Sequence, residues 1–451
     1  MPTPGPGEGR TRRAVLAAAT TTGGAALAAA CAVPGETGAP AAPSKQPVTL
    51  AYWSWFASAS LVTQQPMLDA FKQQQPQITV EWTGVGGAEF LAKVTAAVAG
   101  NTSPDLVYLD NQYQGYFGKQ ALLVDQGPLG RRDRDFGVDQ IDAKALALYT
   151  YDGKVLGYPW TLTTGQVFFN RDLFAAAGRT PPDELVKSGR WTWPAMTEAA
   201  VALTKRGADG KVETLGIAQQ SIWRLALNSN GSDLFDDFRR PKKSRLDEPA
   251  AIAALEYVQD LAHKHRAGWR QPEANDLGGN DLNAYKQGRV AMLVRWGQSY
   301  QMEQVAGATS AVPWPKGPAD RGAPVSDLTT EAVGIMRAGK GPDAGWLFCR
   351  WYQKDWQSTV LRDPANPTAA RVASRGDLQT VARTALPPPQ DVWFEMARIG
   401  VARPVFPDWG KVNTEIIGPN LNPVFNGERA PREGATAAAK QLNDFFAANP
   451  Q

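Results

Sequence analysis

The side chains of this sequence best suited to chemistry are two carboxylates, Asp110 and Glu331, and a set of tryptophans among polar residues. A pair of carboxylates facing one cleft can hydrolyse a glycosidic bond. An indole ring can instead cover the apolar C–H face of a pyranose, while Asp, Asn or Gln side chains orient its hydroxyl groups. These residue types therefore leave two classes open, a carbohydrate-active hydrolase and a protein that binds carbohydrate without changing it.

Several other function classes lack their sequence signals. The chain has no Gly-x-Ser-x-Gly elbow, Walker loop, Gly-x-Gly-x-x-Gly fingerprint or Cys-x-x-Cys pair. A net charge of +3 over 451 residues provides no basic field for nucleic acid. His263 and His265 lie two residues apart on a predicted helix, so they point to different faces and suit no metal site. We expect no cofactor, no metal and no nucleic-acid partner.

Three strands in the first third of the chain are expected to position several of the candidate side chains. Strands are predicted at Val48–Trp53, Ile78–Trp82 and Pro104–Asp110, with helices between them. A β-α-β-α-β order implies right-handed crossovers and a mostly parallel sheet, with ligands beyond the carboxyl ends of the strands. This places a group of candidate ligand-binding residues at one rim, namely Trp53, Trp55, Asp110, Asn111 and Gln112.

The stretch Gly153–Phe174 is expected to join two sheets. A short strand ends at Pro159, which has no N–H for a strand ladder, and a strand buried on both faces follows at Gly165–Phe169. Two strands that meet in this way provide a hinge and bring Trp160 and Thr163 to the junction as candidate ligand contacts. The alternative is one bent strand within a single large sheet.

The N-terminus is interpreted as an export signal, residues 1–30, and a tether, residues 31–46. Thr11–Leu16 resembles a twin-arginine motif, and Leu27–Cys31 resembles a lipobox in which Ala28 departs from the preferred leucine. We therefore expect Cys31 to carry a lipid, with simple cleavage as the alternative. Cys349, the other cysteine, would be an unpaired structural thiol.

The order of several motifs resembles one known family, the maltose-binding-protein-like (family 1) solute-binding lipoproteins of ABC sugar importers. The motifs are Gly153-Lys154-x-x-Gly157-Tyr158-Pro159, Phe169–Phe174, Tyr285–Gln298 and Phe406–Trp409. The resemblance implies an α/β, two-lobed periplasmic-binding-protein fold with discontinuous lobes joined by three hinge crossings, near Pro159, Trp296 and Thr330. The expected lobes are residues 47–160 plus 298–328 for the first and 164–295 plus 332–451 for the second.

The resemblance also implies a function and further site residues. It implies a monomer anchored by lipid to the outer face of the cell membrane, which captures a sugar or oligosaccharide and delivers it to ABC permease subunits. Such a protein is not an enzyme. The candidate ligand contacts that it adds are Gln219, Trp223, Trp296, Gln298, Glu331 and Trp409. The alternatives are a binder of a non-sugar solute, such as a phosphorylated polyol or an amino acid, and a hydrolase that uses Asp110 and Glu331.

Overall fold

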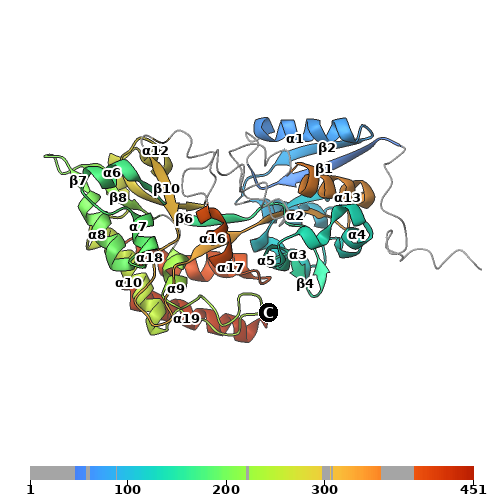
Figure 1. Ribbon diagram of the computed structural model, residues 1–451. Coiled ribbons are helices and arrows are strands. Elements are labelled where there is room, and N and C mark those ends of the chain that lie inside the picture. The colour runs from blue at the N-terminus through green and yellow to red at the C-terminus, as the bar shows by residue number, and fades with distance from the viewer. Residues whose placement is uncertain are drawn as a thin grey trace, which may run out of the picture. The chain divides into compact units, whose positions relative to one another are not determined.

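The computed structural model describes residues 46–56, 61–87, 89–219, 223–296, 305, 308–356 and 391–450. Within these ranges the strands form two main sheets and one short hairpin (Figure 1). Each main sheet has its own covering helices and its own hydrophobic cores. The two sheets with their helices are called the first lobe and the second lobe below, and they confirm the predicted α/β, two-lobed fold.

The first lobe is built on a four-stranded sheet with the order β12-β3-β1-β2. β1 (Val48–Ser54) pairs in parallel with both β2 (Ile78–Gly84) and β3 (Leu106–Asp110), as the sequence predicted. The strand β12 (Glu331–Ile335) comes from far along the chain and pairs with β3 in the antiparallel direction. The carboxyl end of β3 therefore lies beside the amino end of β12.

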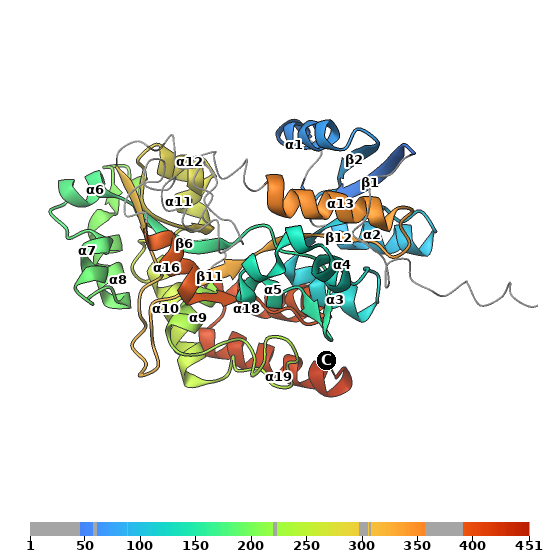
Figure 2. The same ribbon diagram turned by 45° about the vertical axis from the view of Figure 1, so that its right-hand side comes forward.

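Helices from both parts of the chain cover this sheet. The early ones are α1 (Leu61–Gln74), α2 (Phe90–Ala99), α3 (Gln114–Lys119), α4 (Gly127–Arg132) and α5 (Ala143–Ala147), followed by the hairpin β4 (Thr150–Tyr151) and β5 (Lys154–Val155). The late α13 (Pro342–Trp351) and a π-helical turn, Tyr352–Trp356, join them. Figures 1 and 2 show α13 beside the N-terminal elements, and its Phe348 ring lies 5.0 Å from that of Phe71 on α1.

The second lobe is built on a sheet with the order β13-β11-β6-β9-β8-β7, and β10 also pairs with β6. The strands are β6 (Thr163–Asn170), β7 (Lys205–Arg206), β8 (Val212–Ala218), β9 (Val290–Trp296), β10 (Thr309–Val312), β11 (Ser326–Thr329) and β13 (Gly400–Ala402). Nearly all of β6 is buried, because neighbouring strands flank it on both edges. This agrees with the doubly buried strand predicted at Gly165–Phe169.

Helices of the second lobe come from the middle and the end of the chain. They are α6 (Arg171–Ala176), α7 (Pro182–Lys187), α8 (Trp193–Leu203), α9 (Trp223–Ser229), α10 (Pro249–His263), α11 (Gln271–Asp276), α12 (Asp281–Lys286), α16 (Asp391–Ile399), α17 (Trp409–Val412), α18 (Gly418–Phe425) and α19 (Pro431–Ala448), with a π-helical turn at Asn413–Ile417. Thr192 caps α8 through its hydroxyl, and Trp193 stacks on Tyr257 with ring centroids 4.1 Å apart. Trp193 is therefore a core residue.

The predicted lobe boundaries need correction in two segments. β10 was expected in the first lobe, but it pairs with β6, and nearby Trp314 joins the core of the second lobe. β12 and α13 were expected in the second lobe, but β12 pairs with β3 and α13 packs in the first-lobe core. In both segments the strand pairing decides the lobe, and the local sequence does not encode it.

The positions at which the chain passes between the lobes change with these lobe assignments. The first crossing connects Trp160 to β6, as expected. Thr330 connects β11 to β12 at the expected position, but the direction is the reverse of the one predicted, because β11 pairs with β6 in the second lobe and β12 with β3 in the first. The crossing predicted near Trp296 is wrong, because β9 and β10 both pair with β6. The chain instead passes from the first lobe to the second between Trp356 and Asp391.

Hydrogen bonds tie the first two crossings together. The Tyr149 hydroxyl lies 2.5 Å from the carbonyl oxygen of Thr330, and the Thr330 hydroxyl donates to the carbonyl oxygen of Thr161 at 2.5 Å. Both threonines are buried. The two connecting strands therefore form one hydrogen-bonded unit at the junction of the lobes.

Candidate functional site

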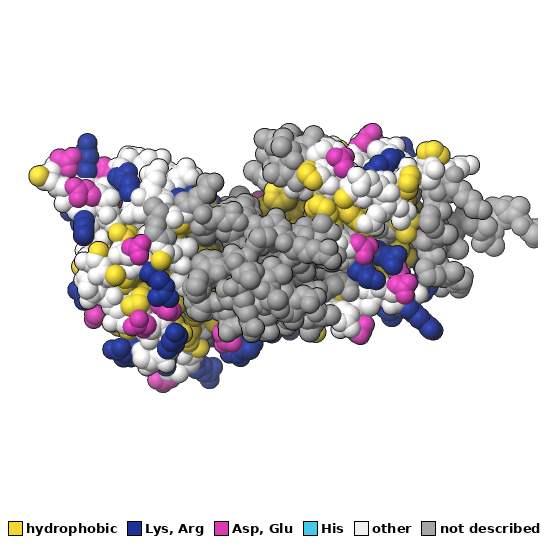
Figure 3. Space-filling model, turned by 45° about the horizontal axis from the view of Figure 1, so that its top comes forward, with side chains coloured by type: hydrophobic (Ala, Val, Ile, Leu, Met, Phe, Trp, Pro, Cys, Tyr) yellow, Lys and Arg dark blue, Asp and Glu magenta, His cyan; other side chains and the backbone are white. Residues whose placement is uncertain are grey.

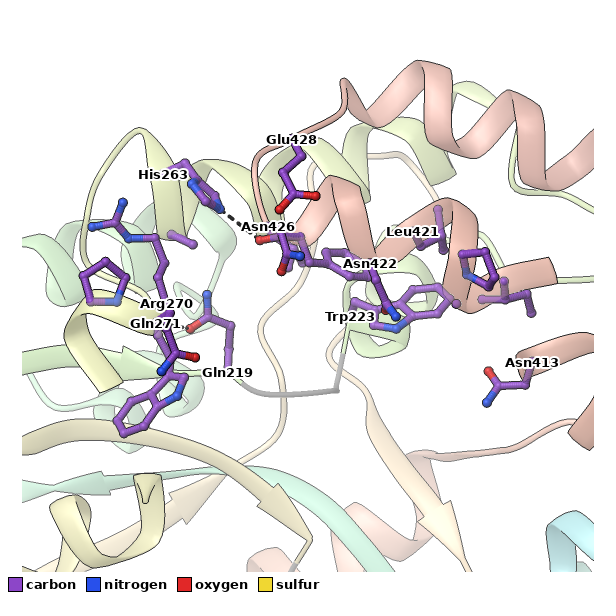
Figure 4. Close-up of a pocket in the computed structure, with 18 of the residues that line it drawn as sticks. Gln219, Trp223, His263, Arg270, Gln271, Asn413, Leu421, Asn422, Asn426 and Glu428 are labelled. Carbon is purple, nitrogen blue, oxygen red and sulfur yellow. Dashed lines mark hydrogen bonds between the residues drawn. The ribbon is translucent and has the colours of Figure 1, made fainter. Parts of the chain in front are cut away.

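A pocket of about 1290 Å³ opens in the second lobe where β8 ends. Helices α9, α10, α11 and α18 and the π-helical turn Asn413–Ile417 contribute its walls. In Figure 4, Gln219, Arg270 and Gln271 lie on one side and Trp223 and Asn422 on the other. Two ligand contacts expected from the sequence, Gln219 and Trp223, are therefore part of one concave surface.

Local packing fixes both of these side chains. The Gln219 amide oxygen accepts a hydrogen bond from the backbone N–H of Trp269 at 3.0 Å. A Cβ at Gly268 would lie 2.3 Å from the Gln219 amide nitrogen, so the close approach of this loop requires glycine. Trp223, the first residue of α9, is half-buried and its ring lies 5.7 Å from that of Phe425.

The pocket lining holds two charged side chains, of which Arg270 is paired, while Glu428 is exposed and has no ion pair among the described residues. Arg270 donates to the carboxylate of Glu273 at 2.9 and 2.5 Å. Burial alone would raise the pKa of Glu273, but hydrogen bonds from Arg270 and Arg206 lower it below its usual value. His263 shares a hydrogen bond of 2.9 Å with the carbonyl oxygen of Phe425.

The remaining polar lining consists mainly of amides. The side chains of Asn413, Asn422 and Asn426 are exposed and make no hydrogen bond with the residues that the structure describes. A carboxamide offers both a donor and an acceptor. Together with the Trp223 ring, these amides suit a neutral ligand that carries hydroxyl groups.

In the first lobe, the structure brings together the two carboxylates that the sequence had paired. Asp110 ends β3 and Glu331 begins β12, and the two are register partners in the antiparallel pair. Burial raises the pKa of Asp110, which the nearby Arg403 and the Gln112 N–H oppose. Burial also raises the pKa of Glu331 to about 7; the Tyr108 hydroxyl lowers it in part, and the Asp110 charge raises it further.

Four aromatic residues form the first-lobe aromatic cluster: Tyr108 and Tyr352, which interact with Glu331, and Trp55 and Trp160, which pack against these two rings. Trp55 stacks on Tyr108 with ring centroids 5.9 Å apart and an interplanar angle of 9°, and Trp160 lies 5.1 Å from Tyr352. The Trp160 backbone N–H donates to the carbonyl oxygen of Glu331 at 2.9 Å. The indole nitrogens of both tryptophans are buried and have no hydrogen-bond partner among the described residues.

Other predicted contacts have structural partners. The Asn111 side-chain oxygen accepts a hydrogen bond from the Thr329 hydroxyl at 3.0 Å, and Asn111 is fully buried. Gln112 donates its backbone N–H to the Asp110 carboxylate at 2.9 Å. Thr163 lies 3.4 Å from the Thr161 hydroxyl, oxygen to oxygen. These residues shape the junction of the lobes.

Two predicted tryptophans pack into cores. Trp53 is half-buried against the first-lobe cluster that contains Phe90. Trp409 is 6% exposed, and its ring packs edge-on against Phe235 and Phe406 at centroid distances of 6.3 and 6.0 Å. A ring buried in this way has little face left to stack on a ligand.

Gln298, Cys31 and the side chain of Trp296 lie outside the part of the chain that the structure describes.

The sequence analysis missed Tyr108, Tyr352 and the three pocket asparagines. Three of these residues had a usable signal. Tyr108 lies two residues before Asp110 on one strand, so both share a face of the sheet. Asn422 and Asn426 are four apart, the spacing of one helical face. Tyr352 approaches Glu331 only through the return of the chain to the first lobe.

The described residues offer neither a metal site nor a membrane-spanning helix. These residues hold no group of three or more His, Cys, Asp or Glu side chains able to bind a metal. None of the described helices has the length and hydropathy to cross a membrane. On the face shown in Figure 3, basic and acidic side chains are interspersed, without a continuous field of one sign.

Comparison with known proteins identifies the family. A putative binding protein of Brucella abortus is 23% identical over 379 residues, which cover 80% of this chain and 84% of that protein. The mannitol-binding protein of Pseudomonas aeruginosa is 21% identical over 413 residues, with coverages of 84% and 89%. The structure of an ABC substrate-binding protein of Listeria monocytogenes in complex with cycloalternan has a TM-score of 0.76 at 18% identity, covering 89% of this chain and 100% of that chain. The model of the bacterial extracellular solute-binding protein family matches residues 56–355, and the chain belongs to this family.

Proposed function

We propose that the chain is the substrate-binding component of an ABC importer, which captures a sugar or related polyol between its lobes and delivers it to membrane permease subunits. The observation that carries this proposal is the lining of the second-lobe pocket. Amides of Asn413, Asn422 and Asn426 line it beside the half-buried Trp223. Indole faces cover sugar C–H groups while amides bind hydroxyls. Mannitol and cycloalternan, which two of the similar proteins bind by name, are both polyhydroxylated.

A phosphorylated polyol is the second candidate, and the pocket favours it less. A phosphate group requires convergent, available cations. Arg270 is the arginine of the pocket lining, and Glu273 already occupies its guanidinium. An ion pair with a buried carboxylate leaves little positive potential for a ligand phosphate. We therefore place neutral sugars and polyols ahead of anionic solutes.

A hydrolase is the other rival, and we propose that the chain is not an enzyme. Hydrolysis by Asp110 and Glu331 requires both carboxylates to reach the bond that is cleaved. Asp110 is buried, 3% exposed, and its carboxylate accepts a hydrogen bond from the backbone of Gln112. Aryl glycosides incubated with the protein should release no phenol. Release that Asp110→Asn abolishes would instead establish a hydrolase.

The same proposal includes export and anchoring. The motif at Thr11–Leu16 would direct twin-arginine export, and Cys31 would become the lipid-bearing first residue of a monomer at the outer face of the cell membrane. Mass spectrometry of the mature protein should find a diacylglyceryl group on Cys31, and Cys31→Ala should release the protein into the medium. A free thiol at Cys31, or cleavage elsewhere, would contradict the anchor.

A thermal-shift screen tests the proposed function. The mature protein is melted with mono-, di- and oligosaccharides and with sugar alcohols, and also with amino acids and sugar phosphates. At a hundredfold excess over its dissociation constant, one ligand should stabilise the protein by about 2.7 kcal/mol. A melting shift with sugars or polyols supports the proposal. Shifts with only amino acids or sugar phosphates, or no shift at all, contradict it.

A further inference from the structure

A segment of the second lobe, residues 403–408, is buried in both lobes. Val405 is 4% exposed and belongs to the first-lobe core cluster that contains Phe117 of α3. The next residue, Phe406, is 1% exposed and packs against Phe235 in the core of the second lobe, with ring centroids 5.4 Å apart. Because these two neighbours are buried in different cores, the segment holds one lobe against the other in addition to the chain crossings.

The first lobe meets this segment with a residue that has no side chain. Gly115 lies on α3, and a Cβ there would be 2.2 Å from the carbonyl oxygen of Val405 and 2.7 Å from the nitrogen of Pro407. Carbon atoms that are not bonded to each other make their best contacts at about 3.5–4.0 Å. Gly115 has a helical backbone, so the lack of space, and not its conformation, requires glycine here. The backbones of the two lobes are therefore in direct contact.

A loop of the second lobe, residues 236–243 and called the strap below, extends this contact. Phe238 packs against the same first-lobe cluster as Val405, and its carbonyl oxygen accepts a hydrogen bond from the Val405 N–H at 3.0 Å. Arg239 donates to the carbonyl oxygen of Ala147, the last residue of α5, at 2.8 Å. The strap thus connects residues 403–408 to the first lobe.

Two ion pairs at the surface border the same region. Arg240 of the strap lies 2.6 Å from the carboxylate of Asp152, between β4 and β5, and Lys119 lies 3.3 Å from that of Asp408. Exposed pairs of this kind contribute little to stability, so apolar packing accounts for most of the contact. The strap, residues 403–408 and the first-lobe residues that they touch are called the junction contact below.

The junction contact is separate from the second-lobe pocket. Among the described residues that line the pocket, none belongs to the junction contact and none comes from the first lobe. A solute held between the lobes must bring the first lobe to the pocket, so the lobes have to move relative to each other on binding. The described arrangement, in which the walls of the pocket come from one lobe, is therefore an open one.

We propose that the junction contact stabilises the open form and so lowers the affinity for the solute from outside the pocket. A ligand favours closure only through its differential affinity for the closed form, and the free energy that stabilises the open form subtracts from the observed affinity. Closure separates residues 405–407 from α3 and Phe238 from the first-lobe core. Substitutions that weaken the contact therefore tighten binding although they touch no ligand. This inference rests on the proposed function, because it concerns closure around the solute.

Two substitutions with matched controls test the inference. Gly115→Ala places a methyl group against the Val405 carbonyl, and Val405→Ala removes the branched methyl groups from the first-lobe core. Gly410→Ala is the control for the first, because a Cβ at Gly410 would have no described neighbour within 4 Å. Val201→Ala is the control for the second, at an exposed position on α8.

Calorimetry on the mature protein uses glucose, maltotriose and mannitol as probes, together with the sugar that gives the largest melting shift in the screen. Gly115→Ala and Val405→Ala should bind at least about fivefold more tightly than the wild type, and both controls should bind as the wild type does. Lower stability with unchanged affinity would show that the contact only supports the fold, and would overturn the proposal. Weaker binding would assign the contact to the closed form and would equally overturn it.

Small-angle scattering without ligand provides a second readout. The radius of gyration of Gly115→Ala should be smaller than that of the wild type, because the population shifts toward the closed form. Phe238→Ala, at a half-buried residue of the strap, should contract in the same way and serves if Gly115→Ala does not fold. Radii equal to that of the wild type would contradict a contact that stabilises the open form.

The outcomes separate this inference from the proposed function. If a sugar or polyol binds the wild type and the junction variants equally well, the inference is wrong and the sugar-binding function stands. If none of the probes binds, the proposed function fails and the scattering without ligand decides the inference. Contraction of the variants then supports the junction contact as a restraint on closure, and unchanged radii overturn it.

Discussion

Glu331 and Asp110 lie directly opposite each other in the antiparallel pair of β12 and β3. Glu331 also follows Thr330, which connects the second-lobe strand β11 to β12. A ligand group bound to Glu331 would therefore contact the first lobe within one residue of a hinge crossing. Such a position can link ligand binding to lobe closure, because a ligand favours a closed form only through contacts that the open form lacks.

The first prediction concerns stability against pH. Burial raises the folded-state pKa of Glu331 to about 7, above its value in an unfolded chain. A carboxyl with a raised folded pKa destabilises the fold progressively as pH rises from the unfolded to the folded pKa. Full ionisation should cost at most about 3 kcal/mol. In urea unfolding from pH 4 to 8, the Glu331→Gln variant should gain stability over the wild type as pH rises. A difference that does not change with pH would contradict a raised pKa.

The second prediction concerns Trp409, which the family resemblance had assigned to ligand stacking. Its ring is buried against Phe235 and Phe406, so Trp409→Ala should remove core packing. Loss of a buried tryptophan typically costs about 3–5 kcal/mol of folding free energy. Denaturant unfolding measures this loss, and calorimetry measures the affinity of the fraction that remains folded. A variant with normal stability and strongly weakened binding would show instead that Trp409 contacts the ligand.

The third prediction concerns Trp223, which should contribute to ligand binding, whereas Trp409 contributes to the core. The half-buried ring of Trp223 lines the pocket, so Trp223→Ala should weaken ligand binding by about 2 kcal/mol or more. Because Trp223 packs chiefly against Phe425, the loss of stability should be smaller than that of Trp409→Ala. Calorimetry with the best ligand from the thermal-shift screen measures the first effect and denaturant unfolding the second. Unchanged ligand affinity in Trp223→Ala would show that the second-lobe pocket is not the ligand-binding site.

Much of the fold was predictable because its strands carry strong local signals. β1, β3 and β6 are apolar runs bounded by Pro, Gly or polar turns. The lobe assignment of β10 and β12 was not predictable in this way. Each is four or five residues long, and such a strand does not encode which sheet edge it will join.

The residues of the candidate site were also predictable only in part from the local sequence. Gln219 and Trp223 were expected from the family resemblance, and both line the pocket. Trp409 was expected on the same basis, but its burial depends on Phe235, far away in the sequence. Whether an aromatic residue stacks on a ligand or packs in a core is decided by such tertiary contacts, which local spacing does not contain.

Small-angle X-ray scattering of the mature protein, with and without its best ligand, tests most directly the claim that one solute is held between the two lobes. The account predicts that saturating ligand contracts the wild type, and that Trp223→Ala contracts less at the same ligand concentration. Calorimetry on the same samples establishes that the ligand is bound. A wild-type protein that binds its ligand with no change in radius of gyration would contradict capture between the lobes.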